Sequence, residues 1–132
     1  VSEIRQNPAI RETIKMLHDQ GANFAAGTDS PFIPYGIAQH FEIIMFVEAG
    51  LTPAEAIRTS TLNVAKNIGV EKDLGSLEVG KLADMAIING DPLRNIRDIR
   101  KVSATIRGGH VYTARDLTTN RTIDTDDTEE EE

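Results

Sequence analysis

The sequence contains no cysteine, and this absence limits both its covalent chemistry and its metal chemistry. Without cysteine there can be no disulfide framework and no thiolate ligand. A metal ion held by this chain would therefore need histidine nitrogens or carboxylate oxygens. The absence of cysteine leaves the cellular compartment undetermined.

Long apolar runs are also missing. No stretch of about 18 apolar residues occurs, which argues against a membrane-spanning helix, and residues 1–7 lack the basic-then-apolar pattern of a signal peptide. Lys and Arg residues alternate with acidic ones instead of forming a basic stripe, which argues against a nucleic-acid partner. The sequence therefore predicts a soluble chain that binds neither membrane nor nucleic acid.

Acidic charge is plentiful but unevenly placed. The 132 residues, 39% of them hydrophobic, suffice for one domain with a core. The formal net charge of −7 equals the charge of seven acidic residues near the end of the chain, which are Asp124, Asp126, Asp127 and Glu129 to Glu132. Such a run repels itself and buries no apolar surface. Residues 118–132 are therefore predicted to be a disordered, solubilising tail, with a binding tail as the alternative.

Two helices are predicted before residue 50. Asn7 and Pro8 form a typical helix start, because an Asn side chain caps free amides and proline fits the first helical position. Gly21 is expected to end this helix. A second helix is predicted over residues 36–49, where an almost wholly apolar stretch indicates burial.

A third helix is predicted from Thr52 to about Ile68. Thr52 and Glu55 have the spacing of a capping box, in which each side chain bonds the other residue's backbone amide. The apolar stripe of this helix is expected to contain Ala54, Ile57, Val64, Ala65 and Ile68.

The remaining elements are predicted strands. Residues 22–27 are small and apolar, which suits a strand covered on both faces in a parallel sheet. Residues 102–107 and 110–112 flank Gly108 and Gly109, and this pattern predicts a hairpin with a two-residue loop.

Asp29 ends the apolar segment and is the first candidate site residue. Carboxyl ends of parallel strands face the ligand in α/β folds, so an Asp at this point can bind a metal or accept a proton from water. Ser30 and Pro31 follow it, however, and Asp29 could instead form an Asx turn with its own backbone. The local sequence leaves both interpretations open.

Four segments, taken together and in this order, resemble the C-terminal part of the amidohydrolase superfamily. The likeness is greatest to its imidazolonepropionase-like and prolidase-like members and extends over about residues 8–113. The segments are "GTDS" at 27–30, "EAGLTPAEAIRTSTLNVAKNIGV" at 48–70, "LGSLEVGKLADMAIINGDPL" at 74–93 and "VSATIRGGHVY" at 102–112.

This resemblance implies an α/β fold that is part of a (β/α)8 TIM barrel. Residues 1–73 would hold the last barrel strand and its flanking helices, and residues 74–117 the returning strands of a small β-sandwich domain. A complete barrel needs about 250 residues, so we expect the chain to be the C-terminal portion of a longer enzyme. By the same resemblance, Lys81 and Asp84 mark the entry to a β-domain strand and are not catalytic.

The resemblance also implies a metal-dependent hydrolase of carbon–nitrogen bonds. The substrate would be a small molecule with an amide, cyclic amide or dipeptide bond, and the cofactor a divalent metal ion, zinc. Asp29 matches the aspartate that binds the metal and acts as general base toward the attacking water. The family's histidine pair, its carboxylated lysine or glutamate and its single histidine ligands have no counterparts here, so we expect the segment alone to be inactive.

The chain's own histidines do not replace these ligands. His18 is expected to be a solvated residue of the first helix, and His110 a strand-face residue of the hairpin. His40 lies eleven residues after Asp29 and is, with Tyr35, a candidate for contact with substrate. The alternative for His40 is a helix residue bonded to a neighbour such as Glu42 or to a backbone carbonyl.

Two further interpretations concern partners. The exposed flank of the last barrel strand is expected to favour self-association, because unpaired strand edges invite pairing. A different class of function is a truncated, non-catalytic relative that acts as an interaction module.

Overall fold

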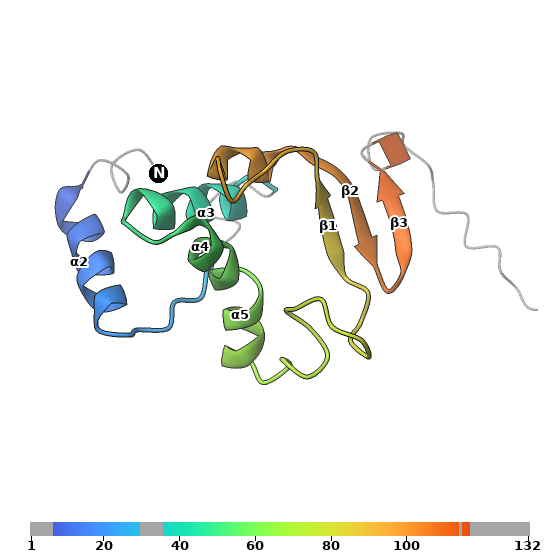
Figure 1. Cartoon of the computed structure of the whole chain (residues 1–132), viewed down its shortest axis with the longest axis horizontal. Helices are drawn as coiled ribbons and strands as arrows, with labels where there is room; N and C mark the ends of the chain where they lie inside the picture. Colours follow the sequence, from blue (N-terminus) through green and yellow to red (C-terminus); the bar gives the residue numbers. More distant parts are fainter. Residues whose placement is uncertain (1–6, 30–35, 114, 117–132) are drawn as a thin grey trace, which may run out of the picture.

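Helices α2 to α5 lie in the first half of the chain, and the strands lie in the second. A computed structural model describes residues 7–29, 36–113 and 115–116 (Figure 1). The helices are α2 (Pro8–Asp19), α3 (Ala38–Glu48), α4 (Pro53–Thr59) and α5 (Leu62–Asn67). The later elements are β1 (Met85–Ile88), the 3-10 helix η1 (Ile96–Arg100), β2 (Val102–Arg107) and β3 (His110–Thr113). The predicted acidic tail, residues 118–132, lies outside the described residues.

The predicted ends of α2 are confirmed. The Asn7 side chain accepts a hydrogen bond from the Ala9 amide at 3.0 Å, and Pro8 is the first helical residue. After the helix, Gly21 has a φ of +85°, a left-handed conformation that glycine adopts without strain. Local signals were sufficient here because the capping groups lie within a few residues of the ends they stabilise.

The capping box of α4 is also confirmed. The Thr52 hydroxyl accepts the Glu55 amide at 3.3 Å, and the Glu55 carboxylate accepts the Thr52 amide at 2.8 Å. These bonds satisfy amides that the first helical turn leaves without partners.

Removal of this cap should destabilise the fold measurably. We expect Thr52→Ala to lower the free energy of unfolding by about 1 kcal/mol, as measured by urea denaturation. Thr61→Ala is the matched control, because Thr61 precedes α5 without forming a side-chain cap. Equal losses in the two variants would contradict the capping explanation.

The single helix predicted to run to Ile68 is instead two helices. The backbone leaves the helical region at Thr61 (φ −130°, ψ −100°), between α4 and α5. The Thr59 and Thr61 hydroxyls donate to the carbonyls of Ala56 and Ile57. Side-chain bonds of this kind compete with continued helix. The predicted stripe is correspondingly wrong at Ala54, which is exposed, and at Ile68, which is 67% exposed.

Residues 22–27 form neither a helix nor a strand in the described part of the chain. A strand requires a hydrogen-bonded neighbour, and the three-stranded sheet contains only β1, β2 and β3. Burial alternates along the segment, with Phe24 and Ala26 half-buried but Ala25 and Gly27 exposed. The prediction of cover on both faces is therefore wrong for this chain by itself, since only one face packs.

The predicted hairpin is confirmed. Strand β2 pairs antiparallel with both β1 and β3, giving the order β1-β2-β3. Gly108 and Gly109 both have positive φ values, as the two-residue loop requires. The Asp84 carboxylate accepts the Gly108 amide at 2.7 Å, which fixes this loop beside the start of β1.

The core joins the helices to the later half of the chain. Its buried members come from α3, α4, the loop between them and η1, and are Ile43, Ile44, Leu51, Ala56 and Ile96. Ile44 is only 1% exposed. The helix η1 lies between β1 and β2 in the sequence and packs against α3. It thus connects the sheet to the helical layer.

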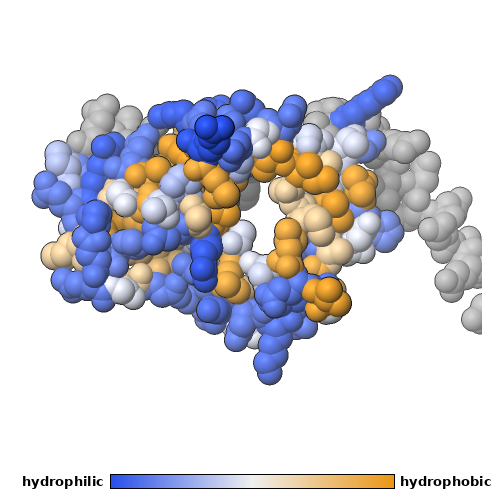
Figure 2. Space-filling view, viewed as in Figure 1, coloured by the Kyte–Doolittle hydropathy of each residue, from blue (hydrophilic) through white to orange (hydrophobic). Residues whose placement is uncertain are grey.

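An apolar groove separates α4 and α5 from the sheet. Figure 2 shows hydrophobic residues around a hollow between these parts. The groove has a volume of about 600 Å³, and its lining includes Val64, Leu74, Leu77, Met85 and Ile88. None of the helices in the described part of the chain has the length and apolar character needed to cross a bilayer.

Candidate functional site

Asp29 lies exposed at the end of the segment formed by residues 22–29. Its φ is +50°, and it is the one non-glycine residue with positive φ in the described part of the chain. Asp is among the residues that enter this left-handed region most readily, although the region is sparsely used by residues with a Cβ. Such conformations occur often at functional sites. The Asx-turn alternative depends on residues 30 and 31, which lie outside the described residues.

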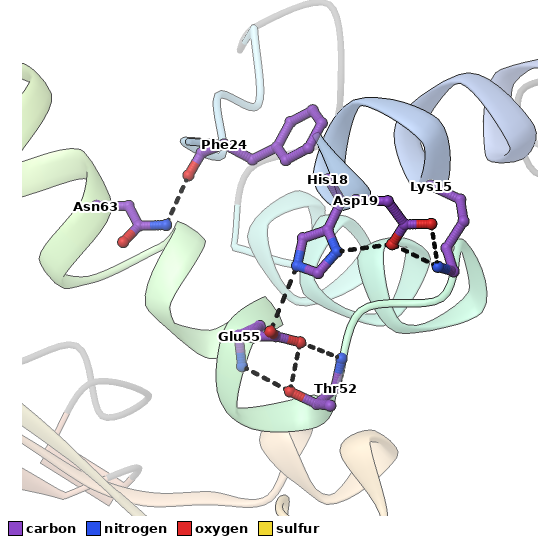
Figure 3. Close-up of polar contacts among 7 residues, drawn as sticks. All are labelled: Lys15, His18, Asp19, Phe24, Thr52, Glu55 and Asn63. Carbon is purple, nitrogen blue, oxygen red and sulfur yellow. Dashed lines mark hydrogen bonds and ion pairs between the residues drawn. The ribbon is translucent and has the colours of Figure 1, made fainter. Parts of the chain in front are cut away.

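The segment that leads to Asp29 is held by helices instead of by neighbouring strands. Its backbone is bonded at Phe24, whose carbonyl accepts the Asn63 amide group at 3.0 Å (Figure 3), and at Ala26, whose N–H donates to the Thr59 carbonyl at 2.9 Å. The rings of Phe24 and Phe46 lie 5.6 Å apart. The helices therefore fix the path of the chain up to the candidate carboxylate.

Glu42 of α3 bonds the backbone two residues before Asp29. Its Oε2 accepts the Gly27 N–H at 2.8 Å. Burial raises the pKa of the half-buried Glu42 carboxyl above its ordinary value, and the bond from Gly27 acts in the opposite direction. The sequence analysis offered Glu42 as a partner for His40. In the structure, Glu42 Oε2 bonds Gly27 instead.

Glu42 should make the stability of the chain depend on pH. Because its pKa is raised in the native state, the native state binds more protons than the unfolded chain above the ordinary value of 4.5. The contribution of Glu42 to stability therefore falls as pH rises through the raised pKa. Glu42→Gln should remove this loss. The free energy of unfolding of the variant minus that of the wild type, measured by urea denaturation, should therefore be larger at pH 7 than at pH 4. An advantage that does not change with pH would contradict this.

His40 lies on α3, half-buried and on the side of η1. Burial lowers the pKa of its imidazole, and the positive charge of Arg100 lowers it further. The same guanidinium lies 5.8 Å from the centre of the Phe41 ring. His40 is thus favoured in its neutral form beside η1, and its contact with substrate stays a prediction. Tyr35, the other candidate, lies outside the described residues.

His18 is not the solvated residue that the sequence predicted. Its side chain is 25% exposed, and its Nε2 lies 3.4 Å from a Glu55 oxygen (Figure 3). Asp19 lies on its other side, with 3.7 Å between Nδ1 and Oδ1. His18 therefore joins the end of α2 to the start of α4, before the segment of residues 22–29 begins. His110 opens β3 opposite Arg107, on an exposed strand face as predicted.

Asp29 has no cluster of metal ligands around it in the described residues. Over residues 7–29, 36–113 and 115–116, no group of three or more His, Cys, Asp or Glu side chains could hold a metal ion. A catalytic zinc ordinarily takes three protein ligands. The described residues therefore do not form a complete metal site by themselves.

The family model for the amidohydrolase family matches residues 2–112 of the chain. The chain belongs to this family. Among curated proteins, it is 42% identical over 71 residues to an imidazolonepropionase of Symbiobacterium thermophilum, covering 52% of this chain and 17% of that protein. It is 35% identical over 102 residues to an imidazolonepropionase of Deinococcus radiodurans, covering 74% of this chain and 23% of that protein.

A solved structure shares the arrangement of the helices and strands. The crystal structure of a Xaa-Pro dipeptidase with bound methionine in the active site matches with a TM-score of 0.74 and 33% identity. The match covers 80% of this chain and 26% of that one. The chain thus spans only about a quarter of the length of this dipeptidase and of the Deinococcus relative.

The sequence analysis missed Glu42 and Asn63 as residues that hold the segment before Asp29. Glu42 had a detectable signal, because it is the one acidic residue within the apolar stretch from Phe41 to Val47. An acidic residue in such a stretch needs a hydrogen-bond donor when it is buried. Asn63 gave no comparable signal, since Asn is common on helix surfaces.

Proposed function

We propose that this chain is the C-terminal portion of a metal-dependent hydrolase of carbon–nitrogen bonds. The observation that carries the proposal is the placement of Asp29, an exposed carboxylate in a left-handed conformation at the end of a segment that three helices hold. Membership of the amidohydrolase family supports it. In this proposal residues 22–29 are the last strand of a (β/α)8 barrel, and residues 74–117 belong to an accompanying β-domain.

The proposed role of Asp29 is to bind the metal ion and to act as general base. A carboxylate beside the attacking water can accept its proton and later return it to the leaving nitrogen. A bound divalent ion, which we propose is zinc, supplies the lowered pKa of that water. The exposed position of Asp29 leaves its oxygens accessible for this purpose, and the remaining ligands would come from outside the described residues.

The proposed substrate is a small molecule with an amide, cyclic amide or dipeptide bond. The named relatives, an imidazolonepropionase and a Xaa-Pro dipeptidase, support this range. Selection of one bond within this range depends, in barrels, on the loops after several strands.

Assay of the complete protein encoded by the gene tests the proposal. With zinc supplied, we expect hydrolysis of an Xaa-Pro dipeptide or of imidazolonepropionate, and loss of activity on treatment with a chelator. The 132-residue chain alone should neither retain stoichiometric zinc nor hydrolyse these compounds. A complete protein that binds zinc but cleaves no amide bond would contradict the proposed reaction.

Self-association is a second proposal, supported by the apolar surface of this chain. Several large apolar side chains are exposed, including Leu77 at 77% and Leu93 at 61%, and the groove beside β1 is lined by apolar residues. Surface of this kind is typical of a protein contact. We expect concentration-dependent association of the 132-residue chain in light scattering, and a strictly monomeric chain at high concentration would contradict this.

A further inference from the structure

The segment before Asp29 is bonded to three helices, α5, α4 and α3, in that order along the chain. Asn23 bonds Asn67 at the end of α5, the Phe24 carbonyl bonds Asn63 within α5, and the Ala26 amide bonds the last residue of α4. The Gly27 amide then bonds Glu42 of α3. The segment is therefore bonded to the helical layer at several points, and Glu42 bonds it two residues before Asp29.

Glu42 directly precedes two buried core residues of α3. The next two residues of α3, Ile43 and Ile44, are 5% and 1% exposed and belong to the core. A side chain anchored on a buried helical turn has little freedom to follow a moving partner. The bond between Gly27 and Glu42 therefore fixes the backbone two residues before Asp29 relative to the core.

The bond is retained although burial opposes the charge of the carboxylate. Burial raises the pKa of Glu42, which means that the charged form is less favoured here than in water. An apolar residue at this position would contribute more to stability than a half-buried glutamate does. This unfavourable burial is consistent with a role in placing the segment.

We propose that Glu42 is a positioning residue for Asp29, holding the Gly27 amide so that the Asp29 carboxylate stays at one place and orientation. The inference rests on the proposed function, in which Asp29 is the general base. Displacement of a reacting group by about 1 Å can lower a rate about 100-fold, so a fixed backbone before Asp29 has a kinetic consequence.

Three variants of Glu42 separate the hydrogen bond from the charge and from the bulk of the side chain. Glu42→Gln keeps an acceptor oxygen at the same reach, Glu42→Leu removes the acceptor, and Glu42→Asp keeps the charge on an arm shorter by one methylene. Glu48→Leu is the matched control on the same helix, because Glu48 pairs with Arg11 and Arg97.

In the complete protein we expect Glu42→Leu and Glu42→Asp to lower kcat by about 10- to 100-fold with KM within twofold of the wild type. Glu42→Gln and Glu48→Leu should keep kcat within about threefold of the wild type. In the 132-residue chain, hydrogen exchange of the Gly27 amide should accelerate in Glu42→Leu and Glu42→Asp but not in Glu42→Gln. The three-bond HN–Hα coupling of Asp29, which reports its φ, should change in the same two variants.

Retention of the Gly27 protection and of the Asp29 coupling in Glu42→Leu would overturn the proposal. So would a Glu42→Gln variant as impaired as Glu42→Leu, because the effect would then come from charge. If Glu42→Leu does not fold, Glu42→Asp and Glu42→Gln decide between the outcomes. If the wild-type protein cleaves no amide bond, the proposed function fails, and the exchange and coupling measurements still decide whether Glu42 places Asp29.

Discussion

Replacement of Asp29 by Asn should reduce kcat of the complete protein by about 10²- to 10⁴-fold, the range that a positioned general base contributes. An amide cannot accept the proton of the attacking water at neutral pH, although its size matches that of the carboxylate. The backbone should be unaffected, because Asn tolerates the left-handed φ of +50° as well as Asp does. Steady-state hydrolysis of an Xaa-Pro dipeptide or of imidazolonepropionate, whichever the wild type cleaves, with zinc supplied measures the effect.

Asp73→Asn is the matched control for this experiment. Asp73 is also exposed, and it lies in the turn after α5. Its backbone N–H donates to the Val70 carbonyl, and its carbonyl accepts the Leu82 N–H. Its replacement should leave kcat within a factor of two. If Asp29→Asn kept the wild-type kcat, Asp29 would not be the base, and the exposed carboxylate would instead be a turn residue.

The parts of the fold that the sequence predicted correctly depend on contacts between near neighbours. The Asn7 cap, the Thr52–Glu55 capping box and the Gly108–Gly109 loop each satisfy backbone groups within a few residues. Their geometry follows from local dihedral preferences and from short side chains, so distant parts of the chain have little influence on them.

The parts that were predicted wrongly depend on distant contacts. Residues 22–27 have the composition of a buried strand, but strand formation needs a paired neighbour, and the described chain supplies helices on one face only. His18 was expected to face solvent because of its place on α2, yet Glu55 of α4 lies against it. Periodicity within one element cannot reveal which residue of another element will lie opposite.

The candidate site shows the same division. Asp29 became a candidate through its place after an apolar segment and through a family resemblance that included "GTDS", and its site role is a proposal. Glu42 and Asn63 also hold the segment. Glu42 lies 15 positions after its partner Gly27, and Asn63 lies 39 positions after its partner Phe24. Contacts at such separation follow from the packing of α3 and α5 against the segment, which no local pattern specifies.

Ile44 is the core residue whose truncation should have the largest effect on stability. It is 1% exposed and packs in the cluster that joins α3 and α4 to η1. Ile44→Ala should lower the free energy of unfolding by about 2–5 kcal/mol, because the variant loses buried apolar area and leaves a cavity. Ile44→Val, which removes one methyl group, should lose about 0.5–1.5 kcal/mol, and urea denaturation followed by circular dichroism measures both.

Ile68→Ala is the control for the Ile44 series. Ile68 was expected to share the apolar stripe of one long helix, but it is 67% exposed after α5 ends. Its truncation should change stability by less than about 0.5 kcal/mol, as is usual at surface positions. If Ile68→Ala were as destabilising as Ile44→Ala, α5 would have to be packed more deeply than the structure describes. Ile44 lies in the cluster through which η1 packs on α3. A neutral Ile44→Ala would therefore contradict a role of this cluster in joining the sheet to the helices.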